Sequence, residues 1–185
     1  MSSACSARPA LASLCSASAA SARRARWVPA YVGVGSNLDA PVVQVQRAIE
    51  ACRSIPETRV VSVSPSYHSK PFGQVAQADF VNAVLGVLTQ LTPEAMLAEL
   101  ASIERKLGRK PSVERWGPRC IDLDLLVFGN ERRATATLQL PHPGIAERDF
   151  VVYPLCDVAP HLEVPGLGRV EALRAQVADR GLRAL

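Results

Sequence analysis

The stretch DFVNAVLGVLT at residues 79–89 and the stretch TPEAMLAELASIERKLG at residues 92–108 decide how this chain folds. The first is rich in β-branched and apolar residues and is typical of a long strand. In the second, Thr92-Pro93-Glu94 supplies a capping side chain, a first-turn proline and an acid that complements the helix dipole. Gly108 stands where a left-handed residue ends a helix. We therefore expect a strand that leads directly into an α-helix.

The sequence before this unit predicts a second strand-and-helix unit. Residues 30–35 and 58–64 are expected to be strands, and the helix between them begins at Pro41. Residues 66–77 show no apolar period and are expected to be a loop. The buried stripe of the helix is expected to contain the apolar residues at three- and four-residue spacing, Val42, Val45, Ile49 and Cys52.

The sequence after this unit predicts one more strand of the sheet. Residues 109–119 are expected to be a polar loop, and residues 120–128 an apolar strand that Gly129 ends. The resulting β-α-β-β-α-β order is that of the ferredoxin-like α+β fold, a split β-α-β arrangement. We therefore expect an antiparallel sheet with helices packed on it, followed by a C-terminal elaboration that ends in a helix near residues 170–180.

Length and composition indicate one globular domain, which we place at residues 29–185. Residues 1–28 are rich in Ala, Ser and Arg and contain no acid, which fits a targeting peptide, a disordered tail or a mis-set start codon. Five cysteines without a CxxC pair favour a reducing compartment. We expect a cytoplasmic protein, with organellar import through residues 1–28 as the alternative. No apolar run approaches the ~20 residues that span a bilayer, so we expect no membrane partner.

The formal net charge of +4 invites the hypothesis of a nucleic-acid partner, but the position of the charge opposes it. Before Asp39 the chain carries four arginines and no acid. Subtracting these four from the 21 basic residues leaves 17, which equals the 17 acidic residues. A neutral body offers no broad surface for phosphate backbones, so we expect no nucleic-acid partner.

Two carboxylates interrupt the apolar strand at residues 120–128. Because side chains alternate between the faces of a strand, Asp122 and Asp124 point the same way, ~6.6 Å apart along it. Like charges there need a compensating cation, and their spacing suits two Mg²⁺ ions that clamp a phosphoryl group. The alternative is an ordinary solvated sheet face. The other face is expected to carry Ile121, Leu123, Leu125 and Val127.

The predicted loop before this strand is rich in arginine, the residue that matches phosphate in bidentate fashion. It contains Arg109-Lys110 and the run Glu114-Arg115-Trp116-Gly117-Pro118-Arg119. We expect these cations to hold a polyphosphate beside the carboxylates. The alternative is that Arg115 pairs with Glu114 and that Trp116 pins the loop to the core.

Three further positions have a functional and a structural interpretation. Asn82 shares a strand face with Phe80, so its amide could read a heterocycle edge, or it could be a satisfied core amide. Glu104 falls on the apolar stripe of its helix, where a carboxylate needs a cation or a buried partner unless it lies at the margin. His142, between two prolines, either donates to a phosphate oxygen or stabilises a turn.

Taken together, these stretches resemble the 6-hydroxymethyl-7,8-dihydropterin pyrophosphokinase family over about residues 30–165. The resemblance rests on five motifs in order, VGSNL from residue 34, DFVNA from residue 79, RWGPR from residue 115, IDLD from residue 121 and PHP from residue 141. It implies that the terminal diphosphate of ATP is transferred to the hydroxymethyl oxygen of a pterin in folate biosynthesis, with release of AMP. ATP and the pterin would be the partners of a protein that we expect to be a monomer.

The resemblance also implies roles for individual residues. Asp122 and Asp124 would hold two Mg²⁺ ions, while Arg109 and Arg119 would stabilise charge on the migrating group. The residues that would bind the pterin are Phe72, Phe80, Asn82, Trp116 and Phe150. The residues that would bind ATP are Glu104, Arg109, His142 and Arg148.

Two positions depart from the family pattern. Lys70 stands where a proline is common beside the pterin, and Pro111 interrupts the basic run after Arg109-Lys110. The first bears on local pterin contacts, and the second on closure of the arginine-rich loop. The competing hypothesis is a noncatalytic ferredoxin-like module that binds a nucleotide or RNA. The basic tail and the element order support it, whereas the two strand carboxylates would repel phosphate without a metal.

Overall fold

The computed structural model describes residues 26–72, 77–109 and 118–185. The expected tail at residues 1–28 falls almost wholly outside these ranges, and so do Lys110, Pro111, Arg115 and Trp116.

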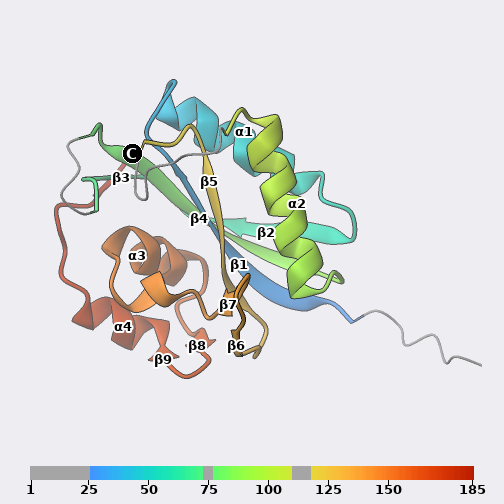
Figure 1. The fold of residues 1–185 in the computed structure, drawn as a ribbon. Coiled ribbons are helices and arrows are strands. Elements are labelled where there is room, and N and C mark those ends of the chain that lie inside the picture. Colours follow the sequence, from blue (N-terminus) through green and yellow to red (C-terminus); the bar gives the residue numbers. More distant parts are fainter. Residues whose placement is uncertain (1–25, 73–76, 110–117) are drawn as a thin grey trace, which may run out of the picture.

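An antiparallel sheet forms the middle layer of the described structure (Figure 1). Its central strand β1, Val28–Ser36, pairs on one side with β4, Phe80–Thr89, and on the other with β5, Asp122–Phe128. The other edge of β4 pairs with β2, Thr58–Val63, and then with β3, Tyr67–Ser69. β1 therefore contributes to the site from the middle of the sheet, with β4 and β5 beside it.

The chain order confirms the predicted α+β class. Helix α1, Pro41–Arg53, follows β1, and helix α2, Pro93–Lys106, lies between β4 and β5. With β2 and β3 acting as one bent edge, the spatial order β5-β1-β4-β2 is that of a split β-α-β sheet. The start and stop signals of α2 are also confirmed. The Thr92 side chain accepts a 3.2 Å hydrogen bond from the N–H of Ala95, and Gly108 has a φ of 91°.

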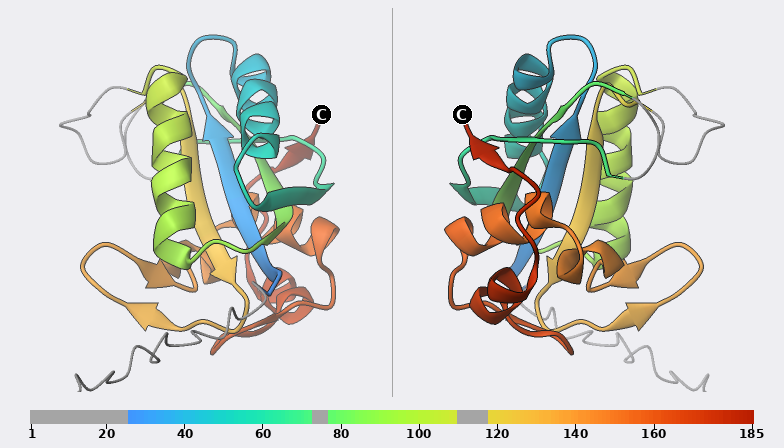
Figure 2. Two further views of the ribbon diagram at one scale, coloured as in Figure 1. Left: turned by 90° about the vertical axis from the view of Figure 1, so that its right-hand side faces the viewer. Right: turned by 90° about the vertical axis from the view of Figure 1, so that its left-hand side faces the viewer.

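Helices cover both faces of the sheet (Figure 2). α1 and α2 pack on one face, over a core that includes Leu100. The opposite face carries α3, Asp149–Val158, and α4, Val170–Gln176, over a second core that includes Val152. The sheet is thus a shared wall between two buried clusters.

The expected C-terminal elaboration contains several short elements besides α3 and α4. They are β6 at Arg133–Ala134, β7 at Gln139–Leu140, the 3₁₀ helix η1 at Pro143–Ala146, β8 at Glu163–Val164, β9 at Gly168–Arg169 and β10 at Arg183–Ala184. β6 pairs with β7 and β8 with β9, whereas β10 returns to the main sheet and pairs with β3. Among the described residues, no helix combines the length and the apolar character that a membrane crossing requires.

The prediction that residues 66–77 form only a loop was wrong, because β3 lies within them. Three residues are too few to show an alternating pattern, and the strand forms because its backbone pairs with β4. The pairing places Tyr67 opposite Asn82 and Ser69 opposite Phe80. Part of the segment that was predicted to be a loop is therefore a strand of the main sheet, next to β4.

β5 contains a bulge that simple alternation does not predict. Its register with β1 shifts by one residue at Leu126. Leu126 and Val127 both join the core beneath α3, whereas Leu125 joins the opposite core. The prediction that Val127 shares a face with Leu125 was therefore wrong, since one inserted residue reverses the alternation beyond it. Asp122 and Asp124 precede the bulge and share the predicted face.

The buried stripe of α1 was also placed partly wrongly. Val42 is 38% exposed, whereas Ala48 is fully buried and Gln44 is buried as well. A stripe through Val42 and one through Ala48 both contain Val45 and Cys52, so the hydrophobic spacing alone did not distinguish them. In the structure, the stripe that contains the small residue Ala48 packs against the sheet.

Replacing Leu100 by alanine should destabilise the fold strongly. Leu100 is a residue of α2 and is fully buried in the core between this helix and the sheet. Truncation to alanine leaves a cavity in that core. We expect the free energy of unfolding, measured by urea denaturation, to fall by about 2–5 kcal/mol. Leu167→Ala is the matched control, because Leu167 is 39% exposed, and should change it by at most about 0.5 kcal/mol. Equal losses in the two variants would contradict the assigned core.

Candidate active site

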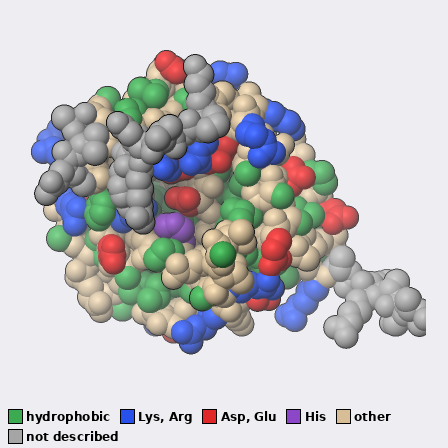
Figure 3. Space-filling model, in the orientation of Figure 1, with side chains coloured by type: hydrophobic (Ala, Val, Ile, Leu, Met, Phe, Trp, Pro, Cys, Tyr) green, Lys and Arg blue, Asp and Glu red, His purple; other side chains and the backbone are tan. Residues whose placement is uncertain are grey.

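A cavity of about 280 Å³ opens on the sheet face that carries α3. Strands β1, β4 and β5 form its floor, and residues near β3 and at the start of α3 form its walls. Figure 3 shows a hollow on this side of the molecule, in which acidic, basic and histidine side chains gather. The cavity therefore combines charged groups with an apolar wall.

Two glycines of β1 keep the cavity floor open. Gly33 and Gly35 lie opposite Asp124 and Asp122 in the pairing of β1 with β5. A Cβ atom on Gly35 would come within 3.0 Å of Asn82 Oδ1, which is tighter than ordinary packing allows without a shift of that amide. Gly35 therefore leaves room for the amide of β4 beside the carboxylates of β5, whereas a Cβ atom on Gly33 would meet only Leu126 at an ordinary 3.5 Å.

Asp122 and Asp124 form the acidic part of the cavity. Burial, and then the charge of Asp122, raises the pKa of Asp124, while His142, Arg148 and Arg119 lower it to a smaller extent. Ionising both carboxylates here costs free energy unless a further cation approaches them. Two hard oxygen donors with partly uncompensated charge fit a divalent cation such as Mg²⁺. No group of three or more His, Cys, Asp or Glu side chains in the described ranges suits a metal, so phosphate and water would complete the coordination.

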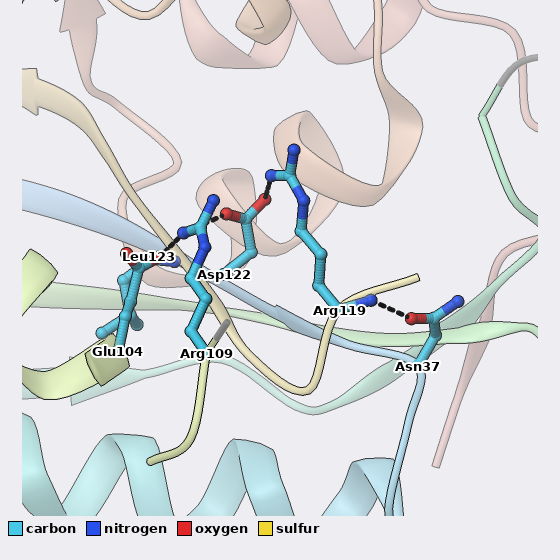
Figure 4. A network of polar contacts seen from close by, with 6 residues as sticks. All are labelled: Asn37, Glu104, Arg109, Arg119, Asp122 and Leu123. Atoms are coloured by element: carbon cyan, nitrogen blue, oxygen red, sulfur yellow. Dashed lines mark hydrogen bonds and ion pairs between the residues drawn. The ribbon is translucent and has the colours of Figure 1, made fainter. Parts of the chain in front are cut away.

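Two arginines hold the Asp122 carboxylate, as Figure 4 shows. Arg109 Nη1 lies 2.8 Å from Asp122 Oδ1, and Arg119 Nη1 lies 2.8 Å from Oδ2. Arg109 also pairs with Glu104 of α2, and Glu104 Oε1 accepts a 2.7 Å hydrogen bond from the N–H of Leu123. Glu104 thereby connects α2 to the outer edge of β5 and holds Arg109 beside Asp122.

Asn37, directly after β1, binds the segments that lead into β4 and β5. Its Oδ1 accepts a 2.8 Å hydrogen bond from the N–H of Arg119, and its own N–H donates to the Arg119 carbonyl at 3.1 Å. Its Nδ2 donates to Gln77 Oε1 at 3.1 Å and to the Ala78 carbonyl at 3.3 Å. One amide therefore joins the end of β1 to the segments that precede β4 and β5.

One wall of the same cavity is aromatic. The rings of Phe72 and Phe150 meet edge to face with centroids 6.2 Å apart, and the Arg148 guanidinium lies 5.3 Å from the first and 5.8 Å from the second. Phe80 lines the same cavity. Beside it, Asn82 Nδ2 donates a 2.7 Å hydrogen bond to Ser69 Oγ. This wall can receive a flat ring and offers an amide at its edge.

His142 presents one ring nitrogen to the cavity. Its backbone N–H donates to the Leu126 carbonyl at 2.8 Å, and its Nδ1 accepts a 3.1 Å hydrogen bond from the N–H of Gly144. Burial lowers the pKa of the ring, although Asp124 acts in the opposite direction. The neutral ring with Nδ1 as acceptor carries its proton on Nε2, which makes it a donor for an anionic oxygen.

The cavity brings together most of the predicted site residues. Glu104 and Arg109 do not line it, and Arg109 reaches it through Asp122. Trp116 lies outside the described residues. The predicted residues that line the cavity are Phe72, Phe80, Asn82, Arg119, Asp122, Asp124, His142, Arg148 and Phe150.

Comparison with known proteins places this chain in a family. Residues 31–160 match the family described as 7,8-dihydro-6-hydroxymethylpterin-pyrophosphokinase (HPPK), and this stretch is more than half of the 185 residues. The chain belongs to the HPPK family. The resemblance drawn from the five sequence motifs is thereby confirmed.

Individual relatives cover nearly the whole HPPK-like part. A 2-amino-4-hydroxy-6-hydroxymethyldihydropteridine pyrophosphokinase of Pseudomonas aeruginosa is 43% identical over 155 residues, which are 84% of this chain and 95% of that protein. The protein of the same name in Haemophilus influenzae is 40% identical over 152 residues, 82% of this chain and 94% of its own length. A crystal structure of Plasmodium falciparum HPPK-DHPS has the same fold, with a TM-score of 0.66 and 14% identity over 84% of this chain. This chain spans 45% of that solved chain.

Sequence reasoning assigned no role to several residues that shape the site. Ser69 and Gln77 were placed in a featureless loop, and Asn37 was only part of a motif. Their contacts reach across 13, 40 and 82 positions of the chain, so no local pattern marks them. The available signal was the Ser36-Asn37 pair directly after a strand that contains Gly33 and Gly35, since serine and asparagine side chains often bind nearby backbone groups.

Glu104→Gln should separate activity from stability. Burial raises the pKa of Glu104, so the ionised carboxylate is less favourable in the folded chain, and this cost is fully present above the raised pKa. Glutamine removes that cost and keeps an oxygen for the N–H of Leu123, but it loses the ion pair with Arg109. We expect the free energy of unfolding at pH 7, measured in urea, to be unchanged or higher.

The same variant should lose turnover by about tenfold or more, because a hydrogen bond to a charged group contributes about 1.5–3 kcal/mol. Glu99→Gln is the matched control on α2, since the contacts with Arg109 and with the N–H of Leu123 belong to Glu104, and it should leave both quantities unchanged. Full turnover in Glu104→Gln would show that Arg109 needs no partner on α2.

Proposed function

We propose that this chain transfers the terminal diphosphate of ATP to the hydroxymethyl oxygen of 6-hydroxymethyl-7,8-dihydropterin and releases AMP, in tetrahydrofolate biosynthesis. The observation that carries the proposal is a single cavity, in a chain of the HPPK family, where paired carboxylates face an aromatic wall. We further propose that residues 29–185 act as one monomeric catalytic domain in the cytoplasm. Organellar import through residues 1–28 is the alternative location.

The reaction exchanges one phosphorus–oxygen bond for another. The acceptor oxygen bonds to the β-phosphorus of ATP, and the bond from that phosphorus to the oxygen shared with the α-phosphate breaks. AMP leaves with the electron pair of the broken bond, and the acceptor hydroxyl gives its proton to water. The protein contributes chiefly by orienting both reactants and stabilising charge, as in other phosphoryl transfers.

Asp122 and Asp124 are the residues that would hold magnesium, and we propose two ions. Support comes from the raised pKa of Asp124, which reflects its burial first and the neighbouring charge of Asp122 second, since a bound cation would offset both. Bound Mg²⁺ would neutralise phosphate oxygens and orient the polyphosphate. The coarser requirement, a metal-dependent reaction with ATP as co-substrate, follows from the family.

The cationic side chains are proposed to bind the phosphates. Arg109 and Arg119 would stabilise charge on the migrating group, and both are already held within 2.8 Å of the Asp122 carboxylate. The Nε2–H of His142 and the guanidinium of Arg148 would donate to ATP oxygens. Arginine suits this task because its planar donors match phosphate in pairs.

The aromatic wall is proposed to bind the pterin. Phe80, Phe150 and Phe72 would enclose the ring, and Asn82 would bond to its polar edge. Ser69 takes one donor of the Asn82 amide, which fixes the orientation of that amide before substrate enters. Trp116 is assigned to the same subsite by family resemblance alone.

The alternative of a noncatalytic nucleotide- or RNA-binding module is not favoured. The basic excess lies in residues before Asp39, and the cavity carries Asp122 and Asp124 where such a module would need cations. Relatives over most of the chain are named as enzymes.

Incubation with Mg²⁺, ATP and 6-hydroxymethyl-7,8-dihydropterin should yield AMP only when all three are present. Chromatography of the nucleotides measures the outcome directly. ADP as the sole nucleotide product would refute diphosphate transfer. RNA binding that survives EDTA, together with no turnover of ATP, would favour the binding module instead.

Asp122→Asn and Asp124→Asn should each lower the rate of AMP formation by about 100-fold or more, because each removes a charge that would hold magnesium at the reacting phosphates. EDTA should abolish the activity of the wild type. Thermal unfolding should show that both variants remain folded, since asparagine keeps the size of aspartate and burial already disfavours the charge of Asp124. Asp39→Asn, at an exposed position after β1, is the control and should keep full activity. Near-normal rates in both site variants would rule out the metal assignment.

A further inference from the structure

The C-terminal segment, which lies outside the family-matched residues 31–160, returns to β3, next to the aromatic wall of the cavity. Helix α4 ends at Gln176, and β10 then pairs with β3 through Arg183 opposite His68 and Ala184 opposite Tyr67. Figure 1 shows this end of the chain beside β3. Residues 177–185 therefore lie next to the strand that leads into the aromatic wall.

A buried carboxylate fixes this segment to α3. Asp149 is 3% exposed, and its Oδ2 accepts a 2.8 Å hydrogen bond from the backbone N–H of Arg180. Its Oδ1 accepts a 2.9 Å hydrogen bond from the N–H of Phe150, whose side chain lines the cavity. One carboxylate thus joins the C-terminal segment to the cavity wall, and burial makes that connection costly to break.

The anchored residue places its own side chain on the aromatic wall. The Arg180 guanidinium lies 4.7 Å from the centroid of the Phe72 ring, closer than that of Arg148 at 5.3 Å. Phe72 stands in a bend between β3 and β4, outside any helix or strand, so backbone pairing does not fix its ring. A guanidinium over a ring face at this distance is a favourable contact.

We propose that Arg180 is a positioning residue for the acceptor subsite. By covering the Phe72 ring, it holds that ring against the flat heteroaromatic acceptor, which makes the C-terminal segment part of acceptor recognition. The inference rests on the proposed function, because it assigns the aromatic wall to the pterin. Arg180 itself does not line the cavity, so it acts through Phe72.

Arg180→Ala should raise KM for the pterin by about two- to fivefold, in proportion to the loss of one exposed cation–π contact. We expect kcat and KM for ATP to stay at the wild-type values, because the carboxylates and their arginines are untouched. Arg183→Ala is the matched control. It removes the same charge from the same segment, but Arg183 joins β3 through its backbone. It should leave all three constants unchanged.

A double-mutant cycle tests the route through Phe72. Phe72→Ala should raise KM for the pterin, and adding Arg180→Ala to it should cause no further rise. Additive effects would overturn the inference, as would an unchanged pterin KM in Arg180→Ala when the wild type forms AMP. Equal losses for both substrates with a lower Tm would also overturn it, since they would show only a structural role. If the wild type forms no pterin-dependent AMP, the proposed function itself fails, and this inference fails with it.

Discussion

Asp122 and Asp124 place two negative charges side by side in a partly closed cavity, and much of the surrounding structure reduces the cost of that placement. The glycines opposite them on β1 leave the space open to solvent and ligand. Two arginines hold the first carboxylate, while burial, and then the charge of Asp122, keeps the pKa of the second raised. Two neighbouring carboxylates in such a cavity repel a polyphosphate alone, so the site binds a polyphosphate more favourably together with metal cations.

The arginines would be of little use to a ligand if they were free to turn elsewhere, and the structure restricts both of them. Glu104 holds Arg109 from α2, and Asn37 holds the backbone of Arg119 from the end of β1. Neither of these partners is exposed, so water competes little for the hydrogen bonds. The phosphate half of the site is therefore arranged before ATP binds, which lowers the reorganisation needed during transfer.

Sequence patterns predicted whatever depends on neighbours along the chain. The cap at Thr92, the left-handed Gly108 and the common face of Asp122 and Asp124 all follow from local spacing and are present. Patterns failed where distant segments decide the outcome. The bulge at Leu126 and the strand β3 arise from pairing with β1 and β4, and the contacts of Asn37 join segments up to 82 positions apart. Tertiary pairing of this kind leaves no periodic trace in either segment.

The carboxylates and the aromatic wall are held in place in different ways. The carboxylates stand on β5, whose backbone is paired with β1 at both positions, so the sheet itself fixes where they lie. The aromatic half comes from a bend at Phe72 and the first turn of α3 at Phe150, which no ladder connects. Its geometry must come from side chains, through the contact of the two rings and the guanidinium groups of Arg148 and Arg180. A wall assembled in this way can change its acceptor preference through residues outside the cavity lining, such as Arg180, whereas the carboxylates keep their positions as long as β5 stays paired with β1.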